Sequence, residues 1–414
     1  VALLANRVQF VVGDQFRAAL PQTFKLLNRR SVVRRRPPVI SFVFEKRNRF
    51  SPGDEFAAEL VFIHQNQLAS GANQCCDFLR RLRKFGQPFV LRRRGGHAPF
   101  LRSLLPTGQS LVCGYPSTTA TSMGSFGTGL PPGSHGLVGY EVLDPGTDAV
   151  FNELSWTDGP DPRSWQPEPT VFERAAAQGV GVARIGPAYF DGSGLTNAAL
   201  RGGRFVAAGP LDARIAATAE AVAATRRSLV YLYWGDVDTV GHVHGCTSFE
   251  WGEEVERVDA ALRRLAALVP DDTAIHVTAD HGMVEVPFDR RIDLAHEAGL
   301  LDGVASVGGE PRAVQLYCRP GAAEDVAAVW RARLGASATV TQRATAVGQG
   351  WFGPVHDRVL PRIGDVLVNL LDDTAVVDSS RMRPELLVLR GLHGSVTEDE
   401  VAIPLLSVPP RAGS

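Results

Sequence analysis

The amino-acid sequence predicts an α/β protein with a doubly wound, mostly parallel sheet between layers of helices and a smaller inserted cap region. From residue 96 onward, short apolar segments alternate with longer helical ones, as in sheets whose strands are joined by helices. The run LVYLYW (229–234) is apolar on both faces, as central parallel strands are. Such sheets bind ligands at the carboxyl ends of their strands, so we expect the chemistry there.

The predicted elements follow one another along the chain. Strands are expected at 109–115, 180–186, 228–235, 273–279 and 313–318, and helices at 118–128, 169–178, 211–227, 248–269 and 321–334. The first strand breaks at Pro116, and the helix after it begins in a run of hydroxyl residues. The last strand and helix belong to a segment, about 284–385, that we expect to form the cap region around the site.

The chain joins two compositions near residue 95. Residues 1–95 hold 18 of the 43 basic and 6 of the 44 acidic residues, which leaves 25 basic and 38 acidic residues for 96–414. Three interpretations are open for 1–95: a basic arm or small disordered domain, a nucleic-acid tail suggested by RRSVVRRRPP at 29–38, or a frame-slipped stretch foreign to the natural protein. We favour the third, because the resemblance described below begins abruptly where the composition changes; all three lysines, Lys25, Lys46 and Lys84, also precede the break.

Bulk properties restrict the partners. The net charge of −1 gives no general attraction to a nucleic-acid polymer or an anionic membrane. No apolar run approaches the roughly 18 residues that span a bilayer, and the start of the sequence lacks the features of a signal peptide. The five cysteines contain no CxxC, so we expect a cytoplasmic protein without structural disulfides. The sequence does not determine the oligomeric state.

Three segments carry Asp or His at predicted strand ends. Asp238 and His242 follow the apolar strand at 228–235, and Asp280 and His281 follow the strand at 273–279. His393 lies between glycines in GLHG, after the apolar run ELLVLR. Carboxylates and imidazoles converging from neighbouring strands form a ligand set that zinc accepts. Each motif alone is also compatible with a polar turn, but the two Asp/His pairs together suggest a two-metal site.

The run YPSTTATS at 115–122 places hydroxyls where a strand gives way to a helix. A helix N-terminus presents free N–H groups and positive potential to an anion. A hydroxyl there is placed to attack phosphorus when a metal lowers its pKa. The alternative is simple N-capping by Ser117 or Thr118, and the two roles can coexist on different residues.

The order YPSTTATS, GTGLPPGSHGLVGY, DVDTVGH, TADHGM and GLHG resembles the alkaline phosphatase superfamily, and within it the type I phosphodiesterase/nucleotide pyrophosphatase group. The resemblance covers residues from about 96 to 408. It implies that Thr119 is the nucleophile of a covalent intermediate and that there are two divalent metal ions, expected to be zinc. Asp238, His242 and His393 match the ligands of one ion. Asp280 and His281, with the oxygen of Thr119, match ligands of the other.

Two positions depart from the family pattern. The family takes a further Asp ligand from an apolar strand that ends in Asp-Gly, some 35–40 residues before the nucleophile. Here the stretch at 78–89 contains no Asp, and Asp77 is the nearest carboxylate. The second departure is Tyr140, which stands where the pyrophosphatase group has an Asn that binds a phosphoryl oxygen. Its hydroxyl would donate in the same way, or it is a packed aromatic residue.

The resemblance implies a catalytic domain at 96–414 that hydrolyses phosphodiester or nucleotide pyrophosphate bonds of a small-molecule substrate. The alternatives are a catalytically impaired phosphate-ester-binding relative that lacks one metal ligand, or a phosphomonoesterase or phosphonate hydrolase of the same superfamily. We expect His135 to be structural and His276 to be a packed core histidine. Arg312, in the cap, is expected at the surface, with an anion as its alternative partner.

Overall fold

A computed structural model describes residues 40–46, 95–297 and 299–411 of the 414-residue chain. The main sheet has seven strands. In spatial order they are β2 (Gln109–Val112), β17 (Ala402–Val408), β8 (Thr273–Ala279), β1 (Ile40–Lys46), β7 (Ser228–Trp234), β5 (Gly181–Gly186) and β6 (Arg204–Ala207). β5, β6 and β7 are mutually parallel, whereas β1 is antiparallel to β7 and β8, and β17 is antiparallel to β8 and β2. Strands β2, β5, β6, β7 and β8 therefore share one direction, which confirms the mostly parallel sheet.

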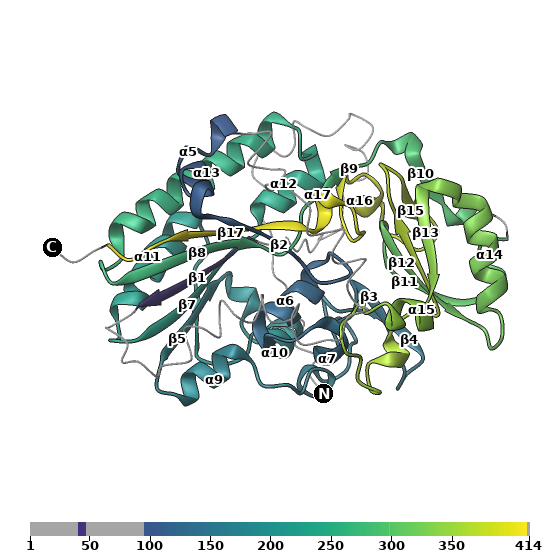
Figure 1. Ribbon diagram of the computed structural model, residues 1–414, viewed down its shortest axis with the longest axis horizontal. Coiled ribbons are helices and arrows are strands. Elements are labelled where there is room, and N and C mark those ends of the chain that lie inside the picture. Colours follow the sequence, from purple (N-terminus) through teal and green to yellow (C-terminus); the bar gives the residue numbers. More distant parts are fainter. Residues whose placement is uncertain (1–39, 47–94, 298, 412–414) are drawn as a thin grey trace, which may run out of the picture. The chain divides into compact units, whose positions relative to one another are not determined.

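Helices cover both faces of this sheet (Figure 1). One layer contains α5 (Pro99–Ser103), α11 (Leu211–Ala223) and α13 (Phe249–Leu268), and the other contains α6 (Thr119–Thr128), α9 (Val171–Ala177) and α10 (Gly194–Ala199). Alternate residues of β7 serve the two cores: Val230, Leu232 and Trp234 pack in the first, Leu229, Tyr231 and Tyr233 in the second. This is why all seven residues of β7 are buried and why its sequence is apolar without alternation.

All ten predicted elements form, with ends within four residues of those expected. The strand at 313–318 is the exception in placement, since β12 (Ala313–Cys318) lies in a separate antiparallel sheet. That sheet has the order β11 (Val304–Glu310), β12, β14 (Val366–Leu370) and β13 (Ala338–Gln342). With helix α14 (Ala323–Leu334) it encloses its own core around Leu316, Trp330 and Val368. The sequence pattern identifies β12 as a buried strand but does not identify its partner strands.

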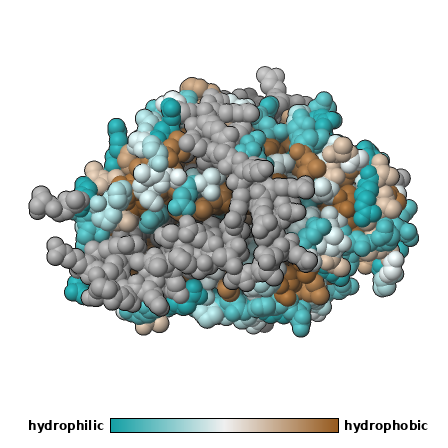
Figure 2. Space-filling view, viewed as in Figure 1, coloured by the Kyte–Doolittle hydropathy of each residue, from teal (hydrophilic) through white to brown (hydrophobic). Residues whose placement is uncertain are grey.

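Two surface properties bear on partners. None of the described helices has both the length and the apolar character that a membrane span requires. Over the described residues on the face in Figure 2, hydrophobic areas are small and separated by hydrophilic ones. Among the described cysteines, Cys113 and Cys318 carry free thiols.

Candidate active site

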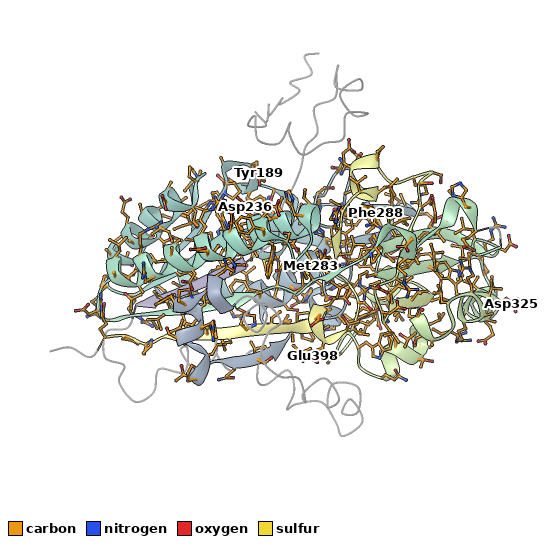
Figure 3. The ribbon with its side chains drawn as sticks, turned by 90° about the horizontal axis from the view of Figure 1, so that it is seen from above. Tyr189, Asp236, Met283, Phe288, Asp325 and Glu398 are labelled. Carbon is orange, nitrogen blue, oxygen red and sulfur yellow. The ribbon has the colours of Figure 1, made fainter. Side chains whose placement is uncertain are left out.

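Three segments meet at one edge of the main sheet. The parallel strands β7 and β8 end at this edge, and the antiparallel strand β17 begins there after the short helix α17 (Glu398–Val401). Asp236, Met283 and Glu398, labelled in Figure 3, belong to these three segments. The predicted metal ligands lie within a few residues of them, and Thr119 comes from a fourth segment, at the start of α6 after β2.

Thr119 is the first residue of α6, and its side chain is 3% exposed. Its hydroxyl donates a hydrogen bond of 2.9 Å to Asp280 Oδ2, and Oγ1 lies 3.3 Å from His281 Nε2. Thr118 occupies the N-cap position in an extended conformation, but its side chain makes no capping hydrogen bond. The simple capping explanation for the hydroxyl run therefore does not hold for Thr118.

Asp238 and His242 lie on one face of a helix, not in a loop. Residues from Asp236 to His244 form α12, and a spacing of four residues in a helix stacks two side chains on the same face. Asp238 Oδ2 is 2.9 Å from His242 Nε2. The helix therefore brings the side chains of Asp238 and His242 together, which the sequence only suggests.

His393 comes from the C-terminal side, directly after β16 (Gly391–Leu392). Asp238, His242 and His393 each offer a ligand atom, and these atoms lie within 4.8 Å of one another, so the three residues could hold a metal ion. The ring of His393 also stacks on that of His281, with centroids 3.6 Å apart. This stacking joins the group around Asp238 to the group around Thr119.

The three histidines share one orientation. Each directs Nδ1 at a backbone carbonyl: His242 to Gly391 O at 2.6 Å, His281 to Gly282 O at 2.9 Å and His393 to Ser117 O at 3.0 Å. A carbonyl only accepts, so each Nδ1 carries a hydrogen and Nε2 is the ring nitrogen left to bind an ion. At His242 this Nε2 lies 2.9 Å from Asp238 Oδ2. Histidines that bind metals are commonly held in this way, with the other ring nitrogen fixed by a hydrogen bond.

The electrostatics of the site also suit a cation. Asp280 Oδ1 is buried and has no hydrogen-bond partner among the described residues. Burial, with the carboxylate of Asp238 nearby, raises the pKa of Asp280 to about 6. Burial and the neighbouring rings of His281 and His242 hold the pKa of His393 well below its usual range, so its imidazole is neutral. An unpaired buried carboxylate oxygen beside a neutral imidazole is a donor pair that a zinc ion accepts.

Burial acts against the charged form of His242 as well, but the adjacent carboxylate of Asp238 outweighs it. The pKa of His242 is therefore raised above its usual value. In the absence of a cation, a proton on this ring compensates the charge of Asp238.

The expected third Asp of the Thr119 group cannot be located. The stretch at 78–89 and Asp77 lie outside the described residues. Strand β1 lies between β7 and β8 in the main sheet. Its first residue, Ile40, pairs with Trp234 and Ala279, at the edge of the sheet where the site residues lie. The single carboxylate residue of β1, Glu45, pairs in register with Leu229 and Ala274, towards the opposite edge. β1 therefore brings no carboxylate residue to the edge where Thr119 lies.

Tyr140 lies just before β3 (Glu141–Asp144), which pairs with β4 (Ala149–Asn152). Its side chain is hydrogen-bonded to that of Asn152, and burial raises its pKa. Its role in binding a phosphoryl oxygen stays a prediction. His135 is fully buried and makes hydrogen bonds with Ser125 and Leu137, while His276 Nδ1 lies 2.9 Å from Ser407 Oγ. The burial and contacts of His135 agree with the structural role expected for it, whereas His276 is half-buried and not a core residue.

Sequence reasoning missed several residues that fix the site. Ser117 exchanges hydrogen bonds with the segment after His393: its hydroxyl donates to Ser395 O at 2.7 Å and accepts from Gly394 N at 3.1 Å. Ser122 Oγ donates to Asp280 O at 2.7 Å. In the sequence, the only indication that Ser117 and Ser122 belong to the site was their position near Thr119 in the hydroxyl run. Glu310, whose carboxylate lies 3.3 Å from His393 Nδ1, had no signal at all.

The expectation for Arg312 was wrong. Its side chain is fully buried and forms a two-pronged ion pair with Glu400, at 2.7 and 2.9 Å. Its remaining hydrogen bonds go to backbone carbonyls. The guanidinium group is thus saturated inside the protein and is not available to an external anion.

Comparisons with known proteins identify the family of this chain. The profile of the family "Type I phosphodiesterase / nucleotide pyrophosphatase" matches residues 87–396. Venom phosphodiesterase 2 of Crotalus adamanteus and venom phosphodiesterase CdcPDE of Crotalus durissus collilineatus are both 26% identical over 239 residues, which are 54% of this chain. The match spans 27% and 26% of those relatives, about a quarter of their length.

Solved structures share the fold. Murine ectonucleotide pyrophosphatase/phosphodiesterase 5 superposes with a TM-score of 0.58 at 18% identity, over 72% of this chain and 79% of that one. An inactive threonine-to-alanine variant of the same protein, in complex with AMP, gives 0.60 at 16% identity, over 79% and 86%. Because the family profile covers about three quarters of the sequence, the chain belongs to the type I phosphodiesterase/nucleotide pyrophosphatase family.

Proposed function

We propose that this chain is a metal-dependent hydrolase of phosphodiester or nucleotide pyrophosphate bonds and that Thr119 is its nucleophile. The observation that carries the proposal is the common orientation of His242, His281 and His393. Each directs Nδ1 at a backbone carbonyl, which leaves Nε2 as the ring nitrogen that could bind an ion. The Nε2 atoms of His242 and His281 face carboxylates, at 2.9 Å from Asp238 Oδ2 and 3.3 Å from Asp280 Oδ2. Such an arrangement is suited to cations and has no evident purpose in a purely structural core.

The residues divide into two groups. Asp238, His242 and His393 would hold one divalent ion, and Asp280 and His281, with the oxygen of Thr119, would hold the other, both expected to be zinc. When bound, such ions neutralise charge on phosphoryl oxygens and lower the pKa of an attacking hydroxyl.

The chain itself supplies position. Thr119 stands at the N-terminus of a ten-residue helix, where free N–H groups favour an anionic phosphate. The hydrogen bond to Asp280 fixes the direction of its hydroxyl. Attack by Oγ1 on phosphorus forms the Thr119–phosphate bond as the P–O bond to the leaving alcohol or phosphate breaks. Water then hydrolyses this threonine phosphodiester, which releases the phosphate monoester and restores the hydroxyl. Little other covalent chemistry is required, because phosphoryl transfer depends mainly on positioning and charge neutralisation.

The substrate class follows from the charge around Thr119. Among the described residues, no Arg or Lys makes a hydrogen bond or ion pair with Thr119, Asp280 or His281. A diester carries one negative charge on its phosphate, whereas a monoester carries about two at neutral pH. We therefore propose a diester or pyrophosphate substrate. The solved neighbour bound to AMP supports a nucleotide as its small-molecule part.

The test compares two chromogenic substrates on the full chain. Zinc-loaded protein should hydrolyse bis(4-nitrophenyl) phosphate with a higher kcat/KM than 4-nitrophenyl phosphate. Dialysis against a chelator should remove the activity, and added zinc should restore it. Indifference to the chelator would refute the metal proposal. A faster monoester reaction would assign the chain to phosphomonoesterases, and no hydrolysis of either would favour the impaired phosphate-ester-binding relative.

A further inference from the structure

The hairpin β11–β12 of the four-stranded sheet turns beside the site. Glu310 ends β11 and pairs with Ala313, so that Pro311 and Arg312 form the tip. Gly309 precedes the tip with a φ of +78°, and a Cβ there would lie 2.1 Å from Ala313 O. Glycine at 309 therefore permits the tight turn that brings Glu310 and Arg312 together.

The carboxylate of Glu310 contacts the segment that carries His393. Glu310 Oε2 is 3.3 Å from His393 Nδ1, and the two residues are only 9% and 7% exposed. The backbone next to the histidine leaves room for this contact. Gly394 has a φ of +126°, and a Cβ at this position would lie 2.6 Å from Glu310 Cδ. A side chain at 394 would force the carboxylate away from the ring.

The contact lies on the ring nitrogen that faces away from the proposed ion. The hydrogen on His393 Nδ1 goes to Ser117 O at 3.0 Å, and the Glu310 carboxylate lies beside the same nitrogen at 3.3 Å without forming a hydrogen bond of good geometry. A carboxylate next to the outer nitrogen of a histidine ligand helps to hold the ring and makes the opposite nitrogen a better ligand.

Arg312 holds the tip of the hairpin in place. Its guanidinium group pairs with both oxygens of Glu400 and donates to the carbonyls of Leu370, Asp372 and Thr374. Glu400 in turn accepts from Ser395 N at 3.0 Å, two residues after His393. The hairpin tip and the His393 segment are therefore joined at two places, and neither can shift alone.

We infer that Glu310 is a positioning residue for the metal group formed by Asp238, His242 and His393, and that the tip of hairpin β11–β12 is part of the active site. The inference rests on the proposed function, since it takes His393 to be a metal ligand. It assigns a role to the sheet that contains β11 and β12, because this sheet supplies the carboxylate beside the ring of a ligand.

A purely structural role for Glu310 makes the opposite prediction. Its Oε1 accepts no hydrogen bond of good geometry among the described residues, although Thr118 lies close to the carboxyl group. A buried polar oxygen without a partner lowers stability, so an apolar residue of similar size would be tolerated or would stabilise the fold. A positioning residue retained at such a cost should lose metal affinity, and not stability, when it is replaced.

The experiment measures zinc affinity of the full-length protein by competition with a chromophoric chelator. Glu310→Met removes the acceptor at similar volume, and we expect one zinc equivalent to bind ~10–100-fold more weakly. Glu310→Gln keeps an acceptor oxygen and should recover part of this loss. The matched control is Glu153→Gln, another fully buried carboxylate, which accepts from Trp165 and Gly139. It should bind zinc within about twofold of the wild type.

A double-mutant cycle separates positioning from a general structural effect. In a His393→Ala background, Glu310→Met should cause no further loss of zinc affinity, because the ring it orients is gone. Equal losses in both backgrounds, wild-type affinity in Glu310→Met, or an equal loss in Glu153→Gln would each overturn the inference. If Glu310→Met does not fold, the test uses Glu310→Gln alone. A zinc affinity of Glu310→Gln equal to that of the wild type would then overturn the inference. A wild-type protein that binds no zinc would instead refute the proposed function.

Discussion

Thr119 Oγ1 and Asp280 Oδ2 lie 2.9 Å apart although 161 residues separate them in the sequence. One begins helix α6 after strand β2, and the other follows strand β8. These two strands run in the same direction in the main sheet and therefore end at the same edge. The contact is thus a consequence of sheet direction, and it gives the first prediction.

Replacing Thr119 should remove turnover without removing metal. We expect Thr119→Ala to lower kcat by at least ~10³-fold, as loss of a nucleophile does in other hydrolases. Asp280, His281 and the Asp238 group remain in place, so zinc content should stay near that of the wild type. Thr119→Ser keeps a hydroxyl and is the matched control. Steady-state kinetics with metal analysis decide the matter, and substantial activity in Thr119→Ala would exclude Thr119 as nucleophile.

Two histidines of helix α12 provide a paired test of the first metal group. His242→Ala removes a proposed ligand and should lower the zinc content by about one equivalent per chain. His244 lies two residues away on the same helix, 3.8 Å from Glu250 and outside the cluster. His244→Ala should keep the full zinc content, as measured by elemental analysis after gel filtration. Equal zinc contents in the two variants would remove His242 from the ligand set.

The ion pair of Arg312 and Glu400 should dominate the stability of the segment before β17. Both side chains are fully buried, so Arg312→Met leaves an uncompensated carboxylate in the interior. We expect a loss of about 3–5 kcal/mol in the free energy of unfolding, measured by chemical denaturation. The double variant Arg312→Met, Glu400→Met removes both charges and should recover most of this loss. A single variant as stable as the wild type would contradict the prediction.

Glu153 should make stability depend on pH. Burial raises its pKa to about 8, from an ordinary value of 4.5. The folded state therefore holds this proton more tightly than the unfolded state. The resulting stabilisation is complete below pH 4.5 and is lost as the pH rises to 8, up to about 5 kcal/mol. Denaturation between pH 5 and 8 should show a shallower slope for Glu153→Gln than for the wild type. Equal slopes would mean that another group is responsible.

The composition break near residue 95 predicts that the gene segment for residues 1–95 is translated naturally in another reading frame. We expect the DNA that encodes the first 95 residues to contain, in another frame, an apolar strand ending in Asp-Gly, which would supply the third ligand of the Thr119 group. Mass spectrometry of the natively expressed protein provides the matching protein-level observation. Tryptic peptides from within residues 1–94 would show that the basic segment is genuine and would contradict the frame slip.

The sequence by itself determined the sheet type, the positions of the predicted elements and the family. Those properties are encoded locally: β7 is apolar on both faces because both faces are covered, and each motif occupies a few consecutive residues. It also identified Asp238, Asp280 and His393 as candidates, since they follow apolar runs whose ends face ligands in such sheets, and the family resemblance added Thr119.

Only the tertiary structure decided which atoms meet and which residues hold them. The α-helical turn at 236–244 brings Asp238 onto His242, and the backbone carbonyl of Ser117 fixes the ring of His393. Glu310 and Arg312 are charged residues in a turn, where sequence alone favours exposure, yet both are buried against the C-terminal segment. Burial of a charge depends on a partner that lies far away in the sequence. In this protein Glu400, 88 residues after Arg312, is that partner, and only the fold brings the two together.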